Sequence, residues 1–432
     1  KRFLYLDVTA RQDYSSTLPP DNNSFFYPAI SGSFLFSEKM KGATWLDFGK
    51  IRLNYAKVGN DAPFASTGDY YNKPPALGSV ALFTLPNAKS NSAVKPEISS
   101  TAEAGLEMAF LKKRLGFDFA VYTKTTDDQI VPVSVSPTTG YTQKFVNAGT
   151  VSNKGVELSV YGSPVQTKDF NWTITVNFSK NISKITKLYE GVDNLQQESK
   201  QGGVTLNASL GEPYGVLKGT DFIYLNGKKV VGADGYYKKT TTADKVIGNI
   251  NPDFNAGITN TLTYKSWALS FLVDCQKGGD VYSLDMYYGL GTGMMPETAG
   301  NNDLGNPVRN TLADGGGVIL DGVNENGEKN TVRVAGDQDV WGWEHNPDKA
   351  FIYDASYVKL REISLNYRIP FKKELFFSSA TFGLVANNVW IIFKNLPYAD
   401  PEAGLGAGNI QGYQTGVMPT TRNFGFNLTL QF

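Results

Sequence analysis

The sequence predicts an all-β fold, a transmembrane antiparallel β-barrel with about twelve strands, and two features of its 432 residues lead to this prediction. The first is an alternation of apolar and polar side chains with the period of a β-strand, which recurs along the chain. The second is an alternation between short and long connections, which is typical of membrane barrels. No window shows a comparable helical period, and no segment has the roughly 20 consecutive apolar residues of a spanning helix.

The C-terminal segment shows the strand period most clearly. In residues 423–432 one face carries Phe424, Phe426, Leu428, Leu430 and Phe432, and the other carries Asn423, Gly425, Asn427, Thr429 and Gln431. The same pattern places Trp172, Ile174, Val176 and Phe178 opposite Thr173, Thr175, Asn177 and Ser179. Such an apolar face can contact lipid in a membrane barrel or fill the core of a soluble sandwich.

Twelve segments with this alternation are each close to the roughly 9–11 residues with which a tilted strand crosses a bilayer. We predict that the strands begin near Arg2, Ile30, Gly49, Ile98, Leu115, Lys154, Trp172, Phe254, Trp267, Ser356, Ala380 and Thr421.

The connections between these segments favour the membrane barrel over the sandwich. Short connections are expected at Lys112–Arg114, Ser163–Asn171, Lys265–Ser266 and Pro370–Ser378, and long ones at Asn60–Glu97, Ile185–Pro252, Gln276–Asp354 and Lys394–Thr420. Membrane barrels have short periplasmic turns and long extracellular loops. A soluble sandwich has no reason to place nearly all of its excess length at one end, so we expect the long loops to be extracellular.

Charge and rare residues exclude several function classes. Lys plus Arg and Asp plus Glu both number 41, so the net charge is zero and the chain lacks the basic excess of a nucleic-acid-binding protein. There is one histidine, His345, and one cysteine, Cys275. Metal sites of His and Cys, disulfide frameworks and Cys–His catalysis within one copy are therefore excluded. We expect no enzyme activity, cofactor or metal, a loop position for His345 among its own aromatic neighbours, and a structural thiol at Cys275.

The long loops are rich in aromatic and amide side chains, which suit the recognition of sugars or peptides. We predict that the contacts with a substrate or a partner protein come from Trp341, Trp343, Tyr236, Tyr237, Tyr70 and Tyr71. For any one of these residues, packing within its own loop is the alternative interpretation.

The last strand also carries a pattern similar to the one read by the outer-membrane insertion machinery. It combines a polar residue, a glycine two positions later, two apolar residues and a terminal aromatic residue. The predicted assembly signal consists of Asn423, Gly425, Leu428, Leu430 and Phe432.

Several segments together resemble a known family. Residues 354–367, DASYVKLREISLNY, look like the most typical stretch of the SusC/RagA family of TonB-dependent outer-membrane transporters. Similar segments follow the same order along nearly the whole chain: Ile51–Asn60, Asn153–Leu158, Ile247–Asp253 and Asp400–Glu402.

The resemblance implies a fold and a function. In that family the chain is about twice as long and forms a 22-stranded barrel with an N-terminal plug. Residues 1–432 would then be the C-terminal part of the barrel with its long extracellular loops, and neither the plug nor the TonB-binding segment is present in this chain. The implied function is uptake of an oligosaccharide or peptide across the outer membrane of a Gram-negative bacterium of the Bacteroidetes type. The implied partners are a SusD-like surface lipoprotein, outer-membrane lipid, and the TonB complex, which acts through the missing N-terminal region.

Three other interpretations remain open from the sequence. Twelve is also a permitted even number for a self-contained outer-membrane barrel. A soluble all-β carbohydrate-binding or adhesion module would use the same apolar faces as a core. A barrel enzyme would need a clustered acid and base, which a lone His345 does not supply.

Overall fold

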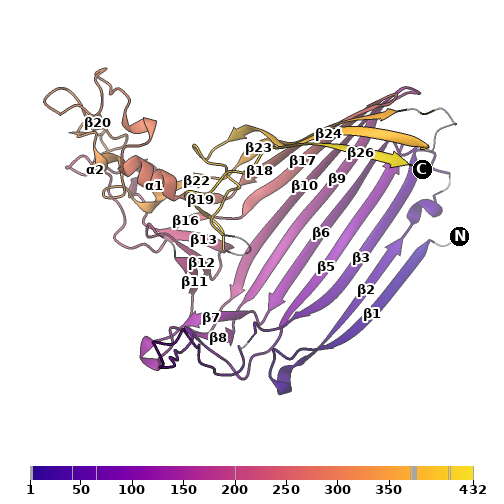
Figure 1. The fold of residues 1–432 in the computed structure, drawn as a ribbon, viewed down its shortest axis with the longest axis horizontal. Helices are drawn as coiled ribbons and strands as arrows, with labels where there is room; N and C mark the ends of the chain where they lie inside the picture. Colours follow the sequence, from indigo (N-terminus) through magenta and orange to yellow (C-terminus); the bar gives the residue numbers. More distant parts are fainter. Residues whose placement is uncertain are drawn as a thin grey trace.

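The central feature of the computed structural model is one antiparallel sheet of twelve strands, in which each strand pairs with the next along the chain (Figure 1). The structure describes residues 3–40, 42–64, 66–199, 201–369, 371, 377–406, 408 and 410–431. The strands of this sheet are β1 (Leu4–Tyr14), β2 (Ser24–Phe34), β3 (Leu46–Asn60), β5 (Glu97–Phe110), β6 (Leu115–Asp127), β9 (Thr150–Gln166), β10 (Phe170–Lys187), β17 (Pro252–Tyr264), β18 (Trp267–Gly278), β23 (Tyr357–Ile369), β24 (Ser379–Lys394) and β26 (Asn423–Gln431). All twelve predicted strands are present, but the start predicted near Ile30 is wrong, because β2 already begins at Ser24.

The pairing register confirms the two faces that the alternation predicts. Val176 of β10 lies opposite Val160 of β9 and Ile258 of β17, so apolar residues continue across neighbouring strands. The next residue, Asn177, lies opposite Ser159 and Gly257 on the other face. Apolar side chains on the first face remain exposed in the structure, as Phe424 at 74% shows. A continuous apolar face that is open to its surroundings is typical of a strand wall in contact with lipid.

The first and last strands lie at opposite ends of the sheet order. Within the residues that the structure describes, β1 pairs with β2 and β26 pairs with β24, and the two edge strands do not pair with each other. Unpaired strand edges cannot face lipid, because their backbone groups would lack hydrogen bonds. The open sheet therefore fits part of a larger barrel better than a self-contained barrel of twelve strands.

The long connections extend from one end of the strands, and the short turns lie at the other (Figure 1). Their strands are β4 (Ala88–Lys89), β7 (Ile130–Ser134), β8 (Gln143–Asn147), β11 (Asn194–Ser199), β12 (Thr205–Ser209), β13 (Tyr214–Gly219), β14 (Tyr224–Leu225), β15 (Lys228–Lys229), β16 (Lys245–Asn249), β19 (Asp280–Ser283), β20 (Val318–Ile319), β21 (Arg333–Val334), β22 (Ile352–Asp354) and β25 (Tyr413–Gln414). Strands β11, β12, β13 and β16 form a four-stranded sheet of their own. The long loops are thus folded structures.

Two short helices lie in the longest loop, where the sequence showed no helical period. They are α1 (Leu284–Gly291) and α2 (Gln338–Trp341), and single turns of 3-10 helix occur at Pro20–Asn22, Phe36–Glu38, Pro137–Thr139, Pro296–Thr298 and Asp348–Phe351. Helix α1 begins at an N-cap serine, Ser283, whose hydroxyl accepts a hydrogen bond from the backbone N–H of Met286. At eight residues it is too short for a periodic pattern to stand out. In the described residues, none of the helices has the length and apolar character needed to span a membrane.

Candidate binding surface at the loop end

Three of the long loops that extend from one end of the strands share a hydrophobic core: those between β10 and β17, between β18 and β23, and between β24 and β26. Its buried members come from three separate connections and are Val204, Leu206, Leu217, Ile247, Tyr282, Leu284, Phe351 and Tyr413. The Tyr282 and Tyr413 hydroxyls donate hydrogen bonds to the backbone carbonyls of Gly202 (2.9 Å) and Val204 (3.0 Å), so their buried polar atoms are satisfied. The three loops therefore pack as one body, which we call the loop lobe: the described residues of 188–251, 279–356 and 395–422.

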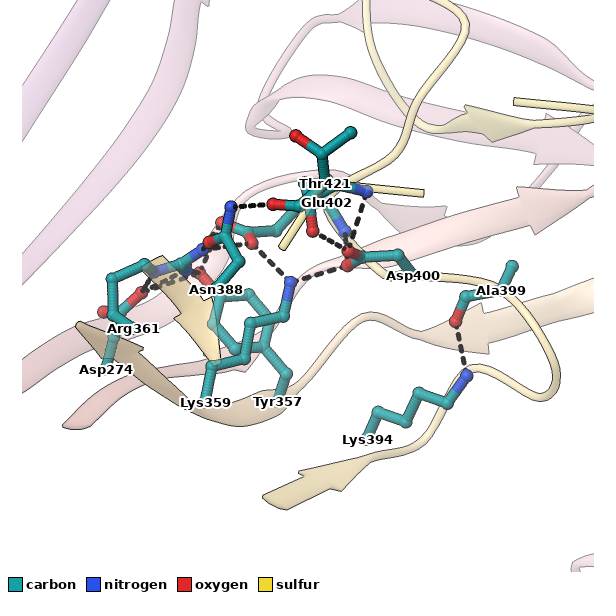
Figure 2. A network of polar contacts seen from close by, with 11 residues as sticks. Asp274, Tyr357, Lys359, Arg361, Asn388, Lys394, Ala399, Asp400, Glu402 and Thr421 are labelled. Atoms are coloured by element: carbon teal, nitrogen blue, oxygen red, sulfur yellow. Dashed lines mark hydrogen bonds and ion pairs between the residues drawn. The ribbon is translucent and has the colours of Figure 1, made fainter. Parts of the chain in front are cut away.

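The loop lobe is joined to the strands by a cluster of charged side chains (Figure 2). We call it the ion cluster: Asp274 on β18, Tyr357, Lys359 and Arg361 on β23, and Asp400 and Glu402 on the loop between β24 and β26. Tyr357 and Lys359 share one face of β23 because side chains two apart on a regular strand point the same way. Arg361 joins them through its contacts with Tyr357 and Asp274. The cluster contains two cations and three carboxylates.

Lys359 is the buried centre of this cluster. Its ammonium group lies 2.6 Å from the Asp400 carboxylate and also pairs with Glu402. The side chains of Lys359 and Asp400 are only 3% and 2% exposed. Such a pair requires further hydrogen bonds to offset the loss of hydration. Asp400 receives them from Thr420 and from the backbone N–H of Glu402 at 3.1 Å.

Arg361 ties the loop to two strands. Its guanidinium donates to both oxygens of Glu402, at 2.8 and 2.9 Å, and its Nε donates to Asp274 at 3.1 Å. Arg361 also donates to the Asn388 side chain at 3.1 Å, and Asn388 donates to the carbonyl of Thr421 at 3.0 Å. A two-sided, bidentate arrangement of this kind is specific to arginine.

A β-bulge in β23 changes which residues face the ion cluster. Leu272 of β18 lies opposite Glu362 and the next residue, Val273, lies opposite Leu360, so Arg361 is the extra residue. Before the bulge the odd-numbered Lys359 lies on the same face as Asp274, and after it the even-numbered Glu362 lies on that face. The predicted apolar face of Ile363, Leu365 and Tyr367 is confirmed, because these residues lie opposite Phe271, Leu269 and Trp267.

The cations control the ionisation of the loop carboxylates. Burial alone would raise the pKa of Asp400, but hydrogen bonds from Lys359 and Thr420 outweigh it and hold the pKa below its ordinary value. For Glu402, burial is likewise outweighed by Arg361 and Lys359, and its pKa is also lowered. Because the carboxyl pKa is lower in the folded loop, ionisation stabilises the folded loop at pH values above the ordinary carboxyl pKa. This stabilisation is lost as the pH falls through the lowered pKa. The ion cluster therefore holds the loop at neutral pH.

Sequence reasoning missed this cluster, although its two halves lie in segments that carry the family resemblance. Lys359 and Arg361 belong to residues 354–367, and Asp400 and Glu402 belong to the Asp400–Glu402 segment. The available signal was that one segment carries two cations two positions apart and the other carries two carboxylates at the same spacing.

The structure brings two of the predicted contact tyrosines against other loop residues. Tyr236 stacks on His345 with a centroid distance of 3.9 Å and an interplanar angle of 17°. Tyr237 donates to the carbonyl of Asp321 at 3.0 Å and packs edge-on against Phe222. Burial raises the pKa of both tyrosines. The loop position expected for His345 is confirmed, but its stacking partner Tyr236 belongs to the connection between β10 and β17 and is not one of the aromatic residues of its own loop.

The four other predicted contact residues lie in different environments. Trp343 stacks on Tyr287 at 4.8 Å and packs against the shared core of the loop lobe. Trp341 is half-buried at the end of α2, and its indole N–H is buried with no hydrogen-bond partner among the described residues. Tyr70 and Tyr71 lie in the separate connection between β3 and β5 and are 42% and 68% exposed. Contact with a ligand or partner stays a prediction for all six residues.

The predicted assembly signal lies on the edge strand β26. Asn423, Gly425, Leu428 and Leu430 lie opposite Asn387, Val385, Phe382 and Ala380 of β24, and they alternate between the two faces as expected. Phe432 lies outside the described residues.

Polar side chains line a hollow on the inner face of the sheet that shares Asp274 with the ion cluster. The hollow has a volume of about 550 Å³, and its charged lining consists of Arg52, Asp118, Glu157 and Asp274. Arg52 bridges neighbouring strands, with ion pairs to Asp118 at 2.7 Å and to Glu103 at 3.3 Å. A polar, charged inner wall is typical of membrane barrels that enclose water, a plug or a hydrophilic cargo.

Known proteins match the chain along its whole length. It is 28% identical to TonB-dependent receptor P26 of Formosa agariphila, an alignment that covers 99% of this chain and 44% of that protein. It is 24% identical to TonB-dependent receptor SusC of Bacteroides thetaiotaomicron, covering 100% of this chain and 42% of that protein. The chain thus spans less than half the length of these relatives.

Solved structures support the fold. The structure of the RagAB peptide transporter matches with a TM-score of 0.76 and 19% identity, covering 100% of this chain and 46% of that chain. The described fold corresponds to a C-terminal part of the barrel, as predicted. These relatives are receptors and transporters, which agrees with the prediction that the chain is not an enzyme.

The family model for the TonB dependent receptor-like β-barrel matches residues 4–389. The resemblance to SusC/RagA transporters is therefore confirmed, and the chain belongs to the TonB-dependent receptor β-barrel family.

Proposed function

We propose that this chain forms the C-terminal part of an outer-membrane nutrient importer in a Gram-negative bacterium of the Bacteroidetes type. The main supporting observation is the combination of an apolar outer face, a charged inner wall and a folded loop lobe at one end of the same sheet. The cargo is an oligosaccharide or a peptide that enters from the loop end.

The energy for import comes from the TonB complex in this proposal. The curated relatives are more than twice as long as this chain, so we assign the plug and the TonB-binding segment to the remaining part of the whole receptor. The 432 residues then supply the barrel wall, the extracellular loops and the contacts with a SusD-like surface lipoprotein. Tyr70, Tyr71, Tyr236, Tyr237, Trp341 and Trp343 remain the candidate residues for contact with the cargo or the lipoprotein.

An uptake experiment tests the import function. Cells that carry the intact receptor gene are given fluorescently labelled oligosaccharides and peptides, and the label inside the cells is compared with and without TonB. We expect uptake of one class of cargo that depends on both the receptor gene and TonB. Equal uptake in cells without TonB would contradict the proposal, and so would equal uptake in cells without the receptor.

We also propose that the C-terminal segment acts as an assembly signal. One aromatic side chain contributes roughly 1.5–3 kcal/mol when it is buried, which is small for a large barrel. Deletion of Phe432 should therefore lower the amount of inserted receptor far more than the melting temperature of the molecules that do insert. The matched control is Phe424→Ala, an aromatic residue of β26 that the sequence alternation groups with Phe432. If both variants insert equally well, Phe432 is an ordinary packing residue.

A further inference from the structure

A second hollow lies within the loop lobe, between α1 and the loop that carries Asp400. Its volume is about 480 Å³, and its apolar lining includes Met286, Met294, Met295, Pro397, Tyr398 and Val417. Met294 is 82% exposed and Tyr398 is 60% exposed. These two large apolar side chains stand open to solvent at the rim, so the hollow is accessible.

The carboxylates and the amide in the lining are already engaged. Asp285 accepts from the Gln414 side chain and, at 2.8 Å, from the backbone N–H of Gly416. Gln414 in turn accepts from the Ser283 hydroxyl at 2.6 Å. Asp400 is held by Lys359 and the other groups of the ion cluster. None of these groups needs a ligand to balance a charge or to complete its hydrogen bonds.

The hydroxyl groups in the lining are engaged as well. Tyr288 donates to the side chain of Gln201 at 3.2 Å, and Thr292 donates to the carbonyl of Tyr288 at 2.7 Å. Tyr398 donates to Glu297 at 3.0 Å. A sugar placed here would lose the hydration of its hydroxyls and find few free partners, which is unfavourable. An apolar group would gain from the loss of contact with water.

The methionines suit a range of apolar shapes. Three of the chain's six methionines line the hollow. Methionine is unbranched and polarisable, and it adapts to different partners.

The neighbouring backbone adds a second feature, because neither Val417 nor Met418 makes a backbone hydrogen bond to another residue that the structure describes. An extended peptide carries one N–H donor and one C=O acceptor per residue, and could pair with this segment.

We propose that this hollow binds an apolar side chain of a peptide cargo, while the peptide backbone lies along residues 415–419. This inference rests on the proposed import function and assigns a substrate class to it. Because residues 397–400 and 414–419 belong to the loop held by the ion cluster, a peptide bound here contacts that loop directly.

Binding to outer membranes from cells that lack TonB tests this site without requiring transport. The probe is a fluorescently labelled pentapeptide with a central leucine between glycines. The comparison probe has aspartate at the centre, and unlabelled maltohexaose is the competitor. We expect the leucine peptide to bind about tenfold or more tightly than the aspartate peptide. Maltohexaose should not displace it.

Three variants locate the site. Val417→Trp should fill the hollow and weaken leucine-peptide binding about tenfold or more. Met294→Gln keeps the size of an exposed rim residue but makes it polar, and should weaken binding by a smaller factor. Met40→Gln is the matched control, an exposed methionine in the connection between β2 and β3, and should leave binding unchanged. The amount of inserted receptor is measured for each variant, so that misassembly is recognised.

Other outcomes overturn the site. Equal binding of the leucine and aspartate peptides, displacement by maltohexaose, or full binding by both Val417→Trp and Met294→Gln would each do so. Uptake in cells with TonB distinguishes the two proposals. TonB-dependent uptake without leucine-peptide binding contradicts the hollow alone, whereas peptide binding without TonB-dependent uptake contradicts the import function.

Discussion

Replacing Lys359 with methionine is expected to detach residues 395–422 from the inner wall of the sheet. The side chains of Lys359 and Asp400 are almost fully buried, and their charged atoms lie 2.6 Å apart. Removal of the cation leaves a buried carboxylate without its counter-charge, a change that costs about 3–5 kcal/mol in buried ion pairs. Limited proteolysis of isolated outer membranes, with mass spectrometry of the fragments, should show new cleavage within residues 395–422.

The control for this variant is the same substitution at an exposed lysine. Lys277 pairs with Asp354 at 3.3 Å, with exposed fractions of 51% and 37%, and such surface pairs contribute little stability. Lys277→Met should leave the cleavage pattern unchanged. In the double variant Lys359→Met with Asp400→Asn the buried charge is gone, so part of the protection should return. If Lys359→Met and Lys277→Met behave alike, the ion cluster does not anchor the loop.

Placing a charge on the lipid face should prevent assembly, whereas the same charge on the inner face should be tolerated. Val176 lies in the middle of β10 between Val160 and Ile258, and an arginine there would face lipid. Such a charge costs about 2–4 kcal/mol near the middle of the bilayer. Val176→Arg should therefore sharply reduce the amount of receptor recovered from the outer membrane.

The adjacent residue is the matched control. Thr175 lies opposite Tyr161 and Thr259, on the face that the polar residues share. Thr175→Arg introduces the same side chain one position away, into the polar interior. Its insertion should remain close to that of the unchanged protein. Equal losses for the two variants would contradict the assignment of the faces.

The sequence predicted the twelve long strands because each has one polar and one apolar face. The faces of residues such as Val176 and Asn177 can be assigned from the period of two in the sequence alone, without knowing which distant residues they contact. The loop strands give a much shorter signal. In β12 Thr205, Asn207 and Ser209 alternate with Leu206 and Ala208, but only over five residues, which is too short for a strand that crosses a bilayer.

The candidate site depended on contacts between distant residues, which a single sequence does not display. Lys359 meets Asp400 across 41 positions, and Asp400 was noted only as part of a family segment. The bulge at Arg361 also shifts the alternation by one residue, so a strict period of two does not place Lys359 and Glu362 on one face. The aromatic candidates Tyr236 and Trp343 were identified by composition, and the structure shows that each packs on another loop aromatic ring.

The most direct test of the account is trypsin digestion of intact cells, because both ends of the strands carry exposed basic residues. Lys228 lies in a hairpin of the loop lobe, and Lys112, Lys113 and Arg114 form the short turn between β5 and β6. An outer-membrane receptor with its long loops outside predicts cleavage at Lys228 in intact cells, and cleavage at 112–114 only after the outer membrane is permeabilised. Cleavage at 112–114 in intact cells, with Lys228 protected, would invert the topology and contradict the proposed importer.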